Sequence, residues 1–474
     1  MNDHSSITRG LGELLDDAGL ITDPARTAPM LRDHRALYRG HALAVVAPAD
    51  TAAVARVVAY CNERRIGVVP QGGNTSYCGG ATPDASSSQV LLSLARLNRV
   101  RGIDVANYTL VAEAGCILAK LQAAAAEADR YLPLSLGSEG SCMLGGNLST
   151  NAGGLNVIRY GMAREMVLGL EVVLADGRVM DTLTGLRKDN TGYDVKSLFL
   201  GAEGTLGVIT AACLKLYPAI RSRATAFVAL RDPQAAVSLL GALREASGDC
   251  VSSFELIPRV GVELTLKHIP GVAEPLDAPS DWYALCELST SRTGEPLEAL
   301  LEKTLAAAYE SGWVMDASVA MSERERDMFW RLRESIPEAQ RKEGASLKHD
   351  ISVPVSQVPR FIEVAGAWVA QYVPQGMLVA YGHLGDGNLH FNINQKPGTQ
   401  PFQLQAVEQK TKRAIHDLVR EFGGSFSAEH GIGQLKVFEL ERYAPPVELD
   451  LMRTLKKALD PNGIMNPGKV LHVK

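Results

Sequence analysis

The chain has 474 residues, of which 46% are apolar and 21% charged, a composition typical of a folded protein with a substantial core and room for two or three domains. Its formal net charge of -5 argues against a general nucleic-acid-binding protein, which would carry a basic field. The seven cysteines form no CxxC pair, which argues against a disulfide framework and a zinc-thiolate site and fits a reducing compartment.

The N-terminus gives an expectation about location. Residues 1–20, MNDHSSITRGLGELLDDAGL, contain no apolar signal core and carry too much acid for a transit peptide. No run approaches the roughly 20 apolar residues needed to cross a bilayer. The sequence therefore predicts a cytoplasmic protein that does not span a membrane.

The first half of the chain begins with a βαβ pattern over residues 43–70. The strand-like run LAVVAPAD leads into a helix with Asp50 or Thr51 as its N-cap, and the apolar run IGVVP follows. Residues 167–181 predict a hairpin, because an Asp-Gly pair lies between two apolar runs. The other elements expected here are strands at 90–94 and 110–115 and an alanine-rich helix at 117–129.

From about residue 219 onward, glycine-rich loops become sparse and strand-like runs such as RATAFVAL and WYALCEL alternate with helices. Helices are expected from about 232, from about 296 and over 322–341. This alternation predicts an antiparallel sheet with helices packed on one face. The last fifty or so residues contain the loop SAEHGIG, a helix near 447–459 and a PNG…NPGK tail. We expect an α+β protein divided at about 218 and 425.

Three glycine-rich loops lie in the first domain, at 70–80, 137–154 and 201–207. Glycine allows main-chain N–H groups to approach a ligand closely, and successive N–H groups form a concave anion site. Neither GxGxxG nor GxxxxGK spacing is present. Each loop by itself is equally well explained as a set of tight turns, but three in one domain favour a cofactor site, which composition does not name.

Two histidines lie in YGHLGDGNLHFNI, residues 381–393. Asp386-Gly387 predicts a two-residue hairpin turn, which would place His383 opposite His390 with Cβ atoms about 4.5–5.5 Å apart. Two imidazoles at that distance can share a metal ion, although zinc needs at least a third protein ligand. The alternative is that each histidine is an ordinary hydrogen-bonded group. The opposite face of the hairpin would enter the core through Leu389, Phe391 and Ile393.

The three loops resemble those of the FAD-binding (PCMH-type) domain of the vanillyl-alcohol-oxidase superfamily. RKDNTGYDVKSLFLGAEGTLGVIT (187–210), YGHLGDGNLHFNI and SAEHGIG are similar to the branch that contains D-2-hydroxyglutarate and D-lactate dehydrogenases, and residues 187–210 with PQGGNTSYCGG are most similar to the former. The resemblance covers nearly the whole chain. It implies an FAD-binding domain over 1–218, a substrate-binding domain over 219–425 and a C-terminal segment, 426–474, that completes the active site.

The resemblance also implies a set of cofactor-binding residues. Because residues 70–80 contain no histidine, through which some relatives attach flavin, we expect FAD to be bound noncovalently. The implied FAD-binding residues are Pro70, Gln71, Gly72, Gly73, Asn74, Thr75, Ser76, Ser138, Gly140, Ser141, Gly145, Thr150, Asn151, Gly204, Ile209 and Asn466.

By the same resemblance, Glu429 is the third metal ligand beside His383 and His390. Zinc is the first expectation because the set has no thiolate, and Mn²⁺ or Co²⁺ stay open. His430 is the catalytic base, and it binds substrate together with three further residues: Arg333, Lys348 and Asn392. Without the resemblance, the charges of 331–354 would be assigned to a solvated face.

The resemblance implies oxidation of a D-2-hydroxy acid, with D-2-hydroxyglutarate, which would give 2-oxoglutarate, as the first expectation. The reaction would proceed by proton removal at His430 and hydride transfer to flavin N5. One departure concerns the substrate: Pro337 stands where some D-2-hydroxyglutarate dehydrogenases have a hydroxyl residue. D-Lactate or D-malate dehydrogenation, an O₂-using oxidase and a non-catalytic flavin-binding subunit of a glycolate-oxidase-like complex are the alternatives. A flavoprotein or quinone is the expected electron acceptor, and a homodimer is compatible with the sequence.

Overall fold

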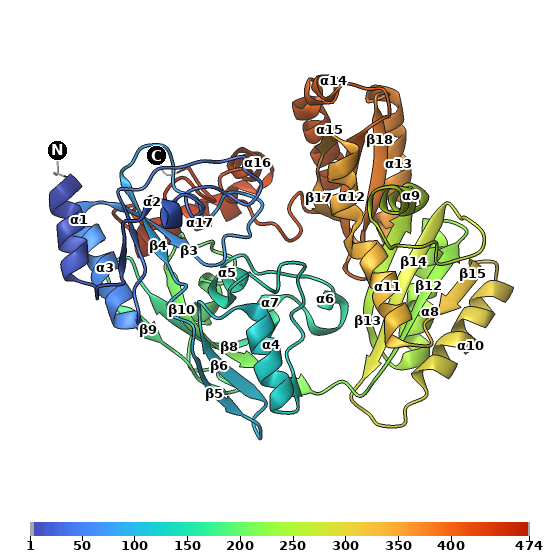
Figure 1. Ribbon diagram of the computed structural model, residues 1–474, viewed down its shortest axis with the longest axis horizontal. Helices are drawn as coiled ribbons and strands as arrows, with labels where there is room; N and C mark the ends of the chain where they lie inside the picture. Colours follow the sequence, from blue (N-terminus) through green and yellow to red (C-terminus); the bar gives the residue numbers. More distant parts are fainter. Residues whose placement is uncertain (1–3, 473–474) are drawn as a thin grey trace. The chain divides into compact units, whose positions relative to one another are not determined.

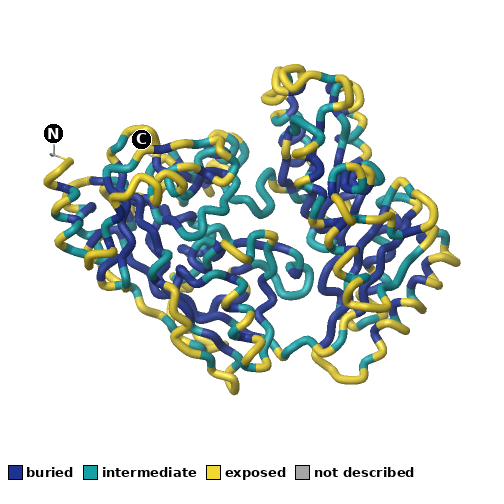
Figure 2. Tube along the Cα trace, in the orientation of Figure 1, coloured by how far each residue is buried: buried dark blue, intermediate teal, exposed yellow. Residues whose placement is uncertain are grey.

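The computed structural model describes residues 4–472, and the chain divides into two compact units. Unit 1 contains the N-terminal part up to Gly154, Gly161–Ala219 and the C-terminal segment from Glu429. Unit 2 contains Leu155–Tyr160 and Ile220–Ala428. Figure 1 shows the elements of both units, and Figure 2 shows that buried residues concentrate along the strands of their sheets.

A four-stranded sheet forms the first part of unit 1, in the order β1-β2-β4-β3. Strands β2 and β3 lie parallel to β4 on either side of it, as a βαβ unit requires. The connecting helix begins where expected, because the Asp50 side chain accepts a hydrogen bond of 2.7 Å from the Ala53 N–H. The elements are α1 (His4–Glu13), β1 (Leu20–Ile21), α2 (Pro24–Thr27), β2 (Ala44–Val46), α3 (Thr51–Arg64), β3 (Gly67–Gln71) and β4 (Gln89–Ser93).

A five-stranded antiparallel sheet follows, in the order β5-β6-β10-β8-β9. The hairpin predicted around Asp176-Gly177 is present as β8 and β9, and Gly177 takes a positive φ of 84° in its turn. The strands are β5 (Val100–Asp104), β6 (Thr109–Glu113), β8 (Val167–Val173), β9 (Val179–Asp181) and β10 (Val208–Lys215). The remaining elements of unit 1 are α4 (Leu118–Glu127), β7 (Arg130–Tyr131), α5 (Leu144–Ser149), α7 (Ala163–Met166), the 3₁₀ turn Val195–Leu198, β11 (Tyr217–Pro218), α16 (Val437–Tyr443) and α17 (Pro446–Leu459).

Unit 2 is built on an eight-stranded antiparallel sheet in the order β15-β12-β14-β13-β18-β19-β16, with β17 also paired to β19. This confirms the antiparallel sheet that the sequence predicts. The strands are β12 (Ser222–Leu230), β13 (Val251–Pro258), β14 (Trp282–Thr290), β15 (Val314–Val319), β16 (Ser346–Leu347), β17 (Asp350–Ser352), β18 (Gly376–His383) and β19 (Asn388–Gln395).

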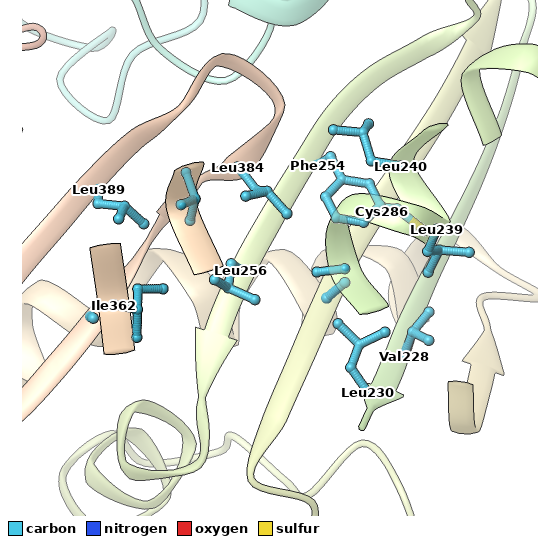
Figure 3. Close-up of a cluster of buried hydrophobic side chains, with 14 of the residues drawn as sticks. Val228, Leu230, Leu239, Leu240, Phe254, Leu256, Cys286, Ile362, Leu384 and Leu389 are labelled. Atoms are coloured by element: carbon cyan, nitrogen blue, oxygen red, sulfur yellow. The ribbon is translucent and has the colours of Figure 1, made fainter. Parts of the chain in front are cut away.

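Alternate residues of these strands enter two separate cores. The larger core contains residues of α8 (Pro233–Ser247), α10 (Leu297–Glu310), α13 (Val358–Tyr372) and α15 (Glu408–Glu421), and Figure 3 shows part of it around Phe254 and Leu256. The smaller core contains residues of α9 (Arg259–His268), α11 (Glu323–Glu334) and α12 (Ile336–Glu343). Helices therefore cover both faces of the sheet, whereas the sequence predicted helices on one face only. The short elements are α6 (Val157–Tyr160), α14 (Pro401–Gln405) and 3₁₀ turns at Val355–Gln357 and Leu384–Asp386.

The single helix expected over 322–341 is two helices. α11 ends at Glu334 and α12 begins at Ile336, with Ser335 between them. Pro337 explains the break, because proline lacks an N–H and is tolerated only in the first turn of a helix. No helix in the described part of the chain combines the length and the apolar character needed to span a bilayer.

Candidate active site

The three glycine-rich loops of unit 1 pack against one another. A Cβ atom on Gly73 of the first loop would collide with the Ser141 carbonyl of the second, so only glycine fits there. The Glu203 N–H of the third loop donates to the Ser149 carbonyl of the second at 2.8 Å. The separate glycine-rich segments of the sequence thus form one surface.

Asn466 of the C-terminal tail lies between the first and third loops. Its Nδ2 donates to the Gly80 carbonyl at 2.9 Å and to the Glu203 carbonyl at 2.7 Å, and its backbone N–H donates to the Val68 carbonyl at 2.8 Å. The side chain is buried, and among residues 4–472 its Oδ1 has no hydrogen-bond partner. A buried acceptor of this kind fits a ligand that brings its own donor.

The first loop presents its backbone as an anion site. Within the described chain, the N–H groups of residues 72–76 donate to no protein acceptor, and these residues are only partly buried. Two predicted cofactor residues hold the loop in place: Gln71 Nε2 donates to the Met30 and Ala81 carbonyls at 2.8 and 2.9 Å, and Asn74 Nδ2 donates to the Arg32 carbonyl at 2.8 Å. Successive open N–H groups are the groups that a pyrophosphate requires, so the loop fits FAD.

Some of the other predicted cofactor residues have side chains that contact the protein, and others lie on accessible backbone. Thr150 Oγ1 donates to the Gly146 carbonyl at 3.0 Å, Asn151 Oδ1 accepts from the Arg164 N–H at 2.9 Å, and Ile209 is buried in β10. Gly145 packs against Ala114, whereas Cβ atoms on Gly140 and Gly146 would meet nothing within 4 Å. Ser138, Gly140 and Ser141 lie on the accessible part of the second loop.

In unit 2, the register predicted for the histidine hairpin is wrong by two residues. Tyr381 pairs with His390, whereas His383 pairs with Glu255 of β13. A 3₁₀ turn over Leu384–Asp386 and Gly387, with φ 81°, replaces the expected two-residue turn. A shift of two residues preserves the face of each side chain, whereas a shift of one would invert it. The two imidazole rings therefore still meet, with their centroids 5.8 Å apart.

Glu255 connects the predicted metal ligand to the predicted substrate clamp. Its Oε1 lies 2.6 Å from His383 Nδ1, and its Oε2 accepts from Arg333 Nε at 2.7 Å and lies 2.6 Å from Arg333 Nη2. The carboxylate has no solvent exposure. Burial alone would raise the pKa of Glu255, but the charge of Arg333 and the contact with His383 outweigh it and lower that pKa to about 2. The sequence signal for Glu255 is a lone charge in the apolar strand FELIP, where buried charges are rare unless paired.

The remaining predicted substrate residues differ in their surroundings. The Arg333 guanidinium lies 4.8 Å from the centroid of the Tyr381 ring and is buried. Lys348 is exposed between β16 and β17. Asn392 is buried, with Nδ2 donating to Gln340 Oε1 at 3.1 Å and Oδ1 accepting from the His349 N–H at 3.2 Å, so its amide holds α12 against β19.

The SAEHGIG loop begins in unit 2, where the Ala428 N–H lies 3.4 Å from the Asp350 carbonyl, and continues into unit 1 from Glu429. In unit 1 the His430 ring lies 4.6 Å from that of Tyr77 in the first glycine loop. Glu203 holds the rest of the loop, because its carboxylate accepts from the Ile432 and Gly433 N–H groups at 2.7 and 2.8 Å.

Glu203 is buried, and burial raises its pKa although these two N–H groups partly oppose the shift. The predicted base is thus held beside the predicted flavin loop. Sequence reasoning missed both Glu203 and Tyr77; the only signal was their place inside glycine-rich segments.

Comparison with known proteins agrees with this geometry. Residues 42–183 match the family described as FAD binding domain, and residues 220–470 match that described as FAD linked oxidases, C-terminal domain. The chain is 40% identical over 459 residues to a probable mitochondrial D-2-hydroxyglutarate dehydrogenase of Oryza sativa subsp. indica, covering 97% of this chain and 80% of the relative. It is 41% identical over 456 residues to mitochondrial D-2-hydroxyglutarate dehydrogenase of Bos taurus, covering 95% and 81%.

A solved structure, p-cresol methylhydroxylase with substrate bound, matches with a TM-score of 0.75 at 18% identity, covering 98% of this chain and 96% of that one. This similarity concerns the fold. The mitochondrial relatives contradict the cytoplasmic location predicted from residues 1–20, because a composition argument about an N-terminus is weaker than similarity over almost the whole chain. The glycine loops, the fold and these matches together place the chain in the FAD-linked oxidase family, among relatives that include the D-2-hydroxyglutarate dehydrogenases.

Proposed function

We propose that the chain oxidises D-2-hydroxyglutarate to 2-oxoglutarate with noncovalently bound FAD. The observation that carries this proposal is the buried Arg333–Glu255–His383 group, which joins a cation suited to carboxylates to a histidine suited to a metal. The similarity to D-2-hydroxyglutarate dehydrogenases supports the choice of substrate.

His383, His390 and Glu429 are proposed as the ligands of a divalent cation, with Zn²⁺ first. The histidine rings lie 5.8 Å apart, and Asp350 is the register partner of His390. Ala428 lies against the Asp350 carbonyl, and Glu429 follows after one peptide, about 3.8 Å between Cα atoms. The chain path thus supports Glu429 as the third ligand. Two nitrogens and a carboxylate form a donor set that suits Zn²⁺ and leaves room for substrate oxygens.

The protein's own groups would divide the remaining work. His430 takes the proton of the 2-hydroxyl group, because a neutral imidazole is a suitable base near pH 7. Arg333 and Lys348 bind the substrate carboxylates, Arg333 through the planar fork of its guanidinium. The chemistry that a divalent cation supplies at such a site is polarisation of the hydroxyl group, and the chemistry that FAD supplies is acceptance of a hydride at N5.

Two cations, Arg333 and Lys348, favour a dicarboxylate over lactate as the substrate. Pro337, in the first turn of α12, has no N–H or hydroxyl group and so cannot donate a hydrogen bond to the distal carboxylate. We infer that electrons leave to a flavoprotein or a quinone, since the sequence has no dinucleotide fingerprint.

The decisive experiment is anaerobic bleaching of the bound flavin by a panel of D-2-hydroxy acids. Reduction fastest with D-2-hydroxyglutarate supports the proposal. Faster reduction by D-lactate or D-malate changes the substrate, and no reduction by any member identifies a non-catalytic flavoprotein. Rapid reoxidation by air with release of peroxide would identify an oxidase.

A further inference from the structure

The carboxylate of Glu255 occupies an unusual place in the sheet of unit 2. It projects from the middle of β13 on the face that carries the smaller core, and its strand neighbours Phe254 and Leu256 belong to the larger core. It is one of few charged groups that the described chain buries completely. Each of its oxygens serves a different partner, Oε1 for His383 and Oε2 for Arg333.

Stability alone does not account for this group. A buried ion pair regains little more than the desolvation energy of its two charges, and well-packed apolar side chains are often as stabilising. The two partners come from different elements, β18 and α11, and lie 128 and 78 residues away from Glu255 in the sequence. An arrangement that spans three elements orients side chains more effectively than it stabilises the fold.

The contact with His383 also determines which ring nitrogen carries the proton. A carboxylate next to a guanidinium stays ionised, and an ionised carboxylate only accepts hydrogen bonds. His383 Nδ1, at 2.6 Å from Glu255 Oε1, must therefore be the donor. In the neutral ring, the form that binds a metal, the lone pair then lies on Nε2.

We propose that Glu255 is a positioning residue that holds His383 in the tautomer whose lone pair lies on Nε2 and simultaneously holds the Arg333 guanidinium for the substrate carboxylate. This inference rests on the proposed metal centre and substrate. Glu255 would contact neither the metal ion nor the substrate. It would act through His383 and Arg333 and so orient the metal site and the acid-binding site together. Loss of an outer carboxylate of this kind typically weakens metal binding by about 10–100-fold.

The test is the Zn²⁺ dissociation constant of Glu255→Gln, measured by competition with a chromophoric chelator on the FAD-loaded protein. Glutamine keeps the shape but removes the charge, so we expect Zn²⁺ to bind about 10–100-fold more weakly than to wild type. The matched control is Glu287→Gln on the neighbouring strand, a mostly buried glutamate that accepts from Trp330 Nε1 at 3.1 Å and from Thr225 Oγ1 at 3.0 Å. The control should bind Zn²⁺ within about 2-fold of wild type.

The outcomes separate this inference from the function it rests on. If His383→Ala loses Zn²⁺ but Glu255→Gln binds it as wild type does, the positioning role is refuted and the metal centre stands. If wild type binds none of Zn²⁺, Mn²⁺ and Co²⁺, the metal centre itself is refuted, and the role of Glu255 with it. Should Glu255→Gln not fold, Glu255→Gln/Arg333→Gln leaves no unpaired buried charge and should show the same loss of Zn²⁺ affinity.

Discussion

Replacing Asn466 by aspartate tests the convergence of the flavin loops most directly. The exchange preserves size and tolerates the positive φ of 42° at this position, but it removes both donors from the side chain. The Gly80 and Glu203 carbonyls, which accept at 2.9 and 2.7 Å, would then face a carboxylate. The change therefore removes two donor hydrogens and places a buried carboxylate beside two carbonyl oxygens.

The magnitude follows from those two contacts. A buried acceptor left without its donor costs about 1–3 kcal/mol, so the loss of the two donors alone lowers the free energy of unfolding of unit 1 by about 2–6 kcal/mol, and the buried charge adds to this. For a unit of this size the melting temperature should fall on the order of 10 °C. FAD should also be lost on desalting, because the first and third loops are no longer held together.

Two assays check this prediction: thermal unfolding followed by circular dichroism, and the ratio of flavin to protein absorbance after desalting. The matched control is Asn462→Asp, the same exchange in the same tail at an exposed amide that bonds to Asn62 Oδ1 at 3.0 Å. Its effect should stay within about 0.5 kcal/mol. If both variants have the same melting temperature and retain the same amount of flavin, Asn466 does not hold the loops together and the prediction is refuted.

Four further outcomes are expected. His430→Ala should retain the flavin spectrum but slow anaerobic flavin reduction by at least about 100-fold, and near-normal reduction would remove its role as the base. EDTA should abolish turnover in wild type and Zn²⁺ should restore it, whereas His383→Ala should not recover at the same Zn²⁺ concentration. Because the pKa of Glu255 is lowered from 4.5 to about 2, its contribution to stability is complete above pH 4.5 and is lost as the pH falls toward 2. Between pH 4.5 and 2, wild type should therefore lose more of the free energy of unfolding that it has at neutral pH than Glu255→Gln/Arg333→Gln does, as measured by denaturant titration at each pH. Leu256→Ala should lower the free energy of unfolding by about 3–5 kcal/mol in denaturant titration, since the side chain is fully buried between sheet and helices.

Local patterns predicted the elements that depend on neighbouring residues. The N-cap at Asp50, the hairpin at Asp176-Gly177 and the helices α4 and α17 follow from spacing and turn chemistry within about twenty residues. The break between α11 and α12 was also available locally, from Pro337, but helical periodicity on both sides concealed it. These features depend on interactions that the sequence displays directly.

The site divides in the same way. Three glycine loops, two histidines in one turn and a Glu-His pair in SAEHGIG are visible in the sequence, and the alternation of strand residues places both histidines on one face even in the wrong register. The sequence by itself therefore determined which kinds of residue form the site, and that they lie partly in glycine-rich loops and partly in histidine-containing segments. What only the tertiary structure decided was which distant groups meet: Glu255 with His383 and Arg333, Glu203 with the SAEHGIG loop, and Asn466 with two loops. The reason is physical, because strand order and loop packing depend on burial summed over the whole core, which no local pattern encodes.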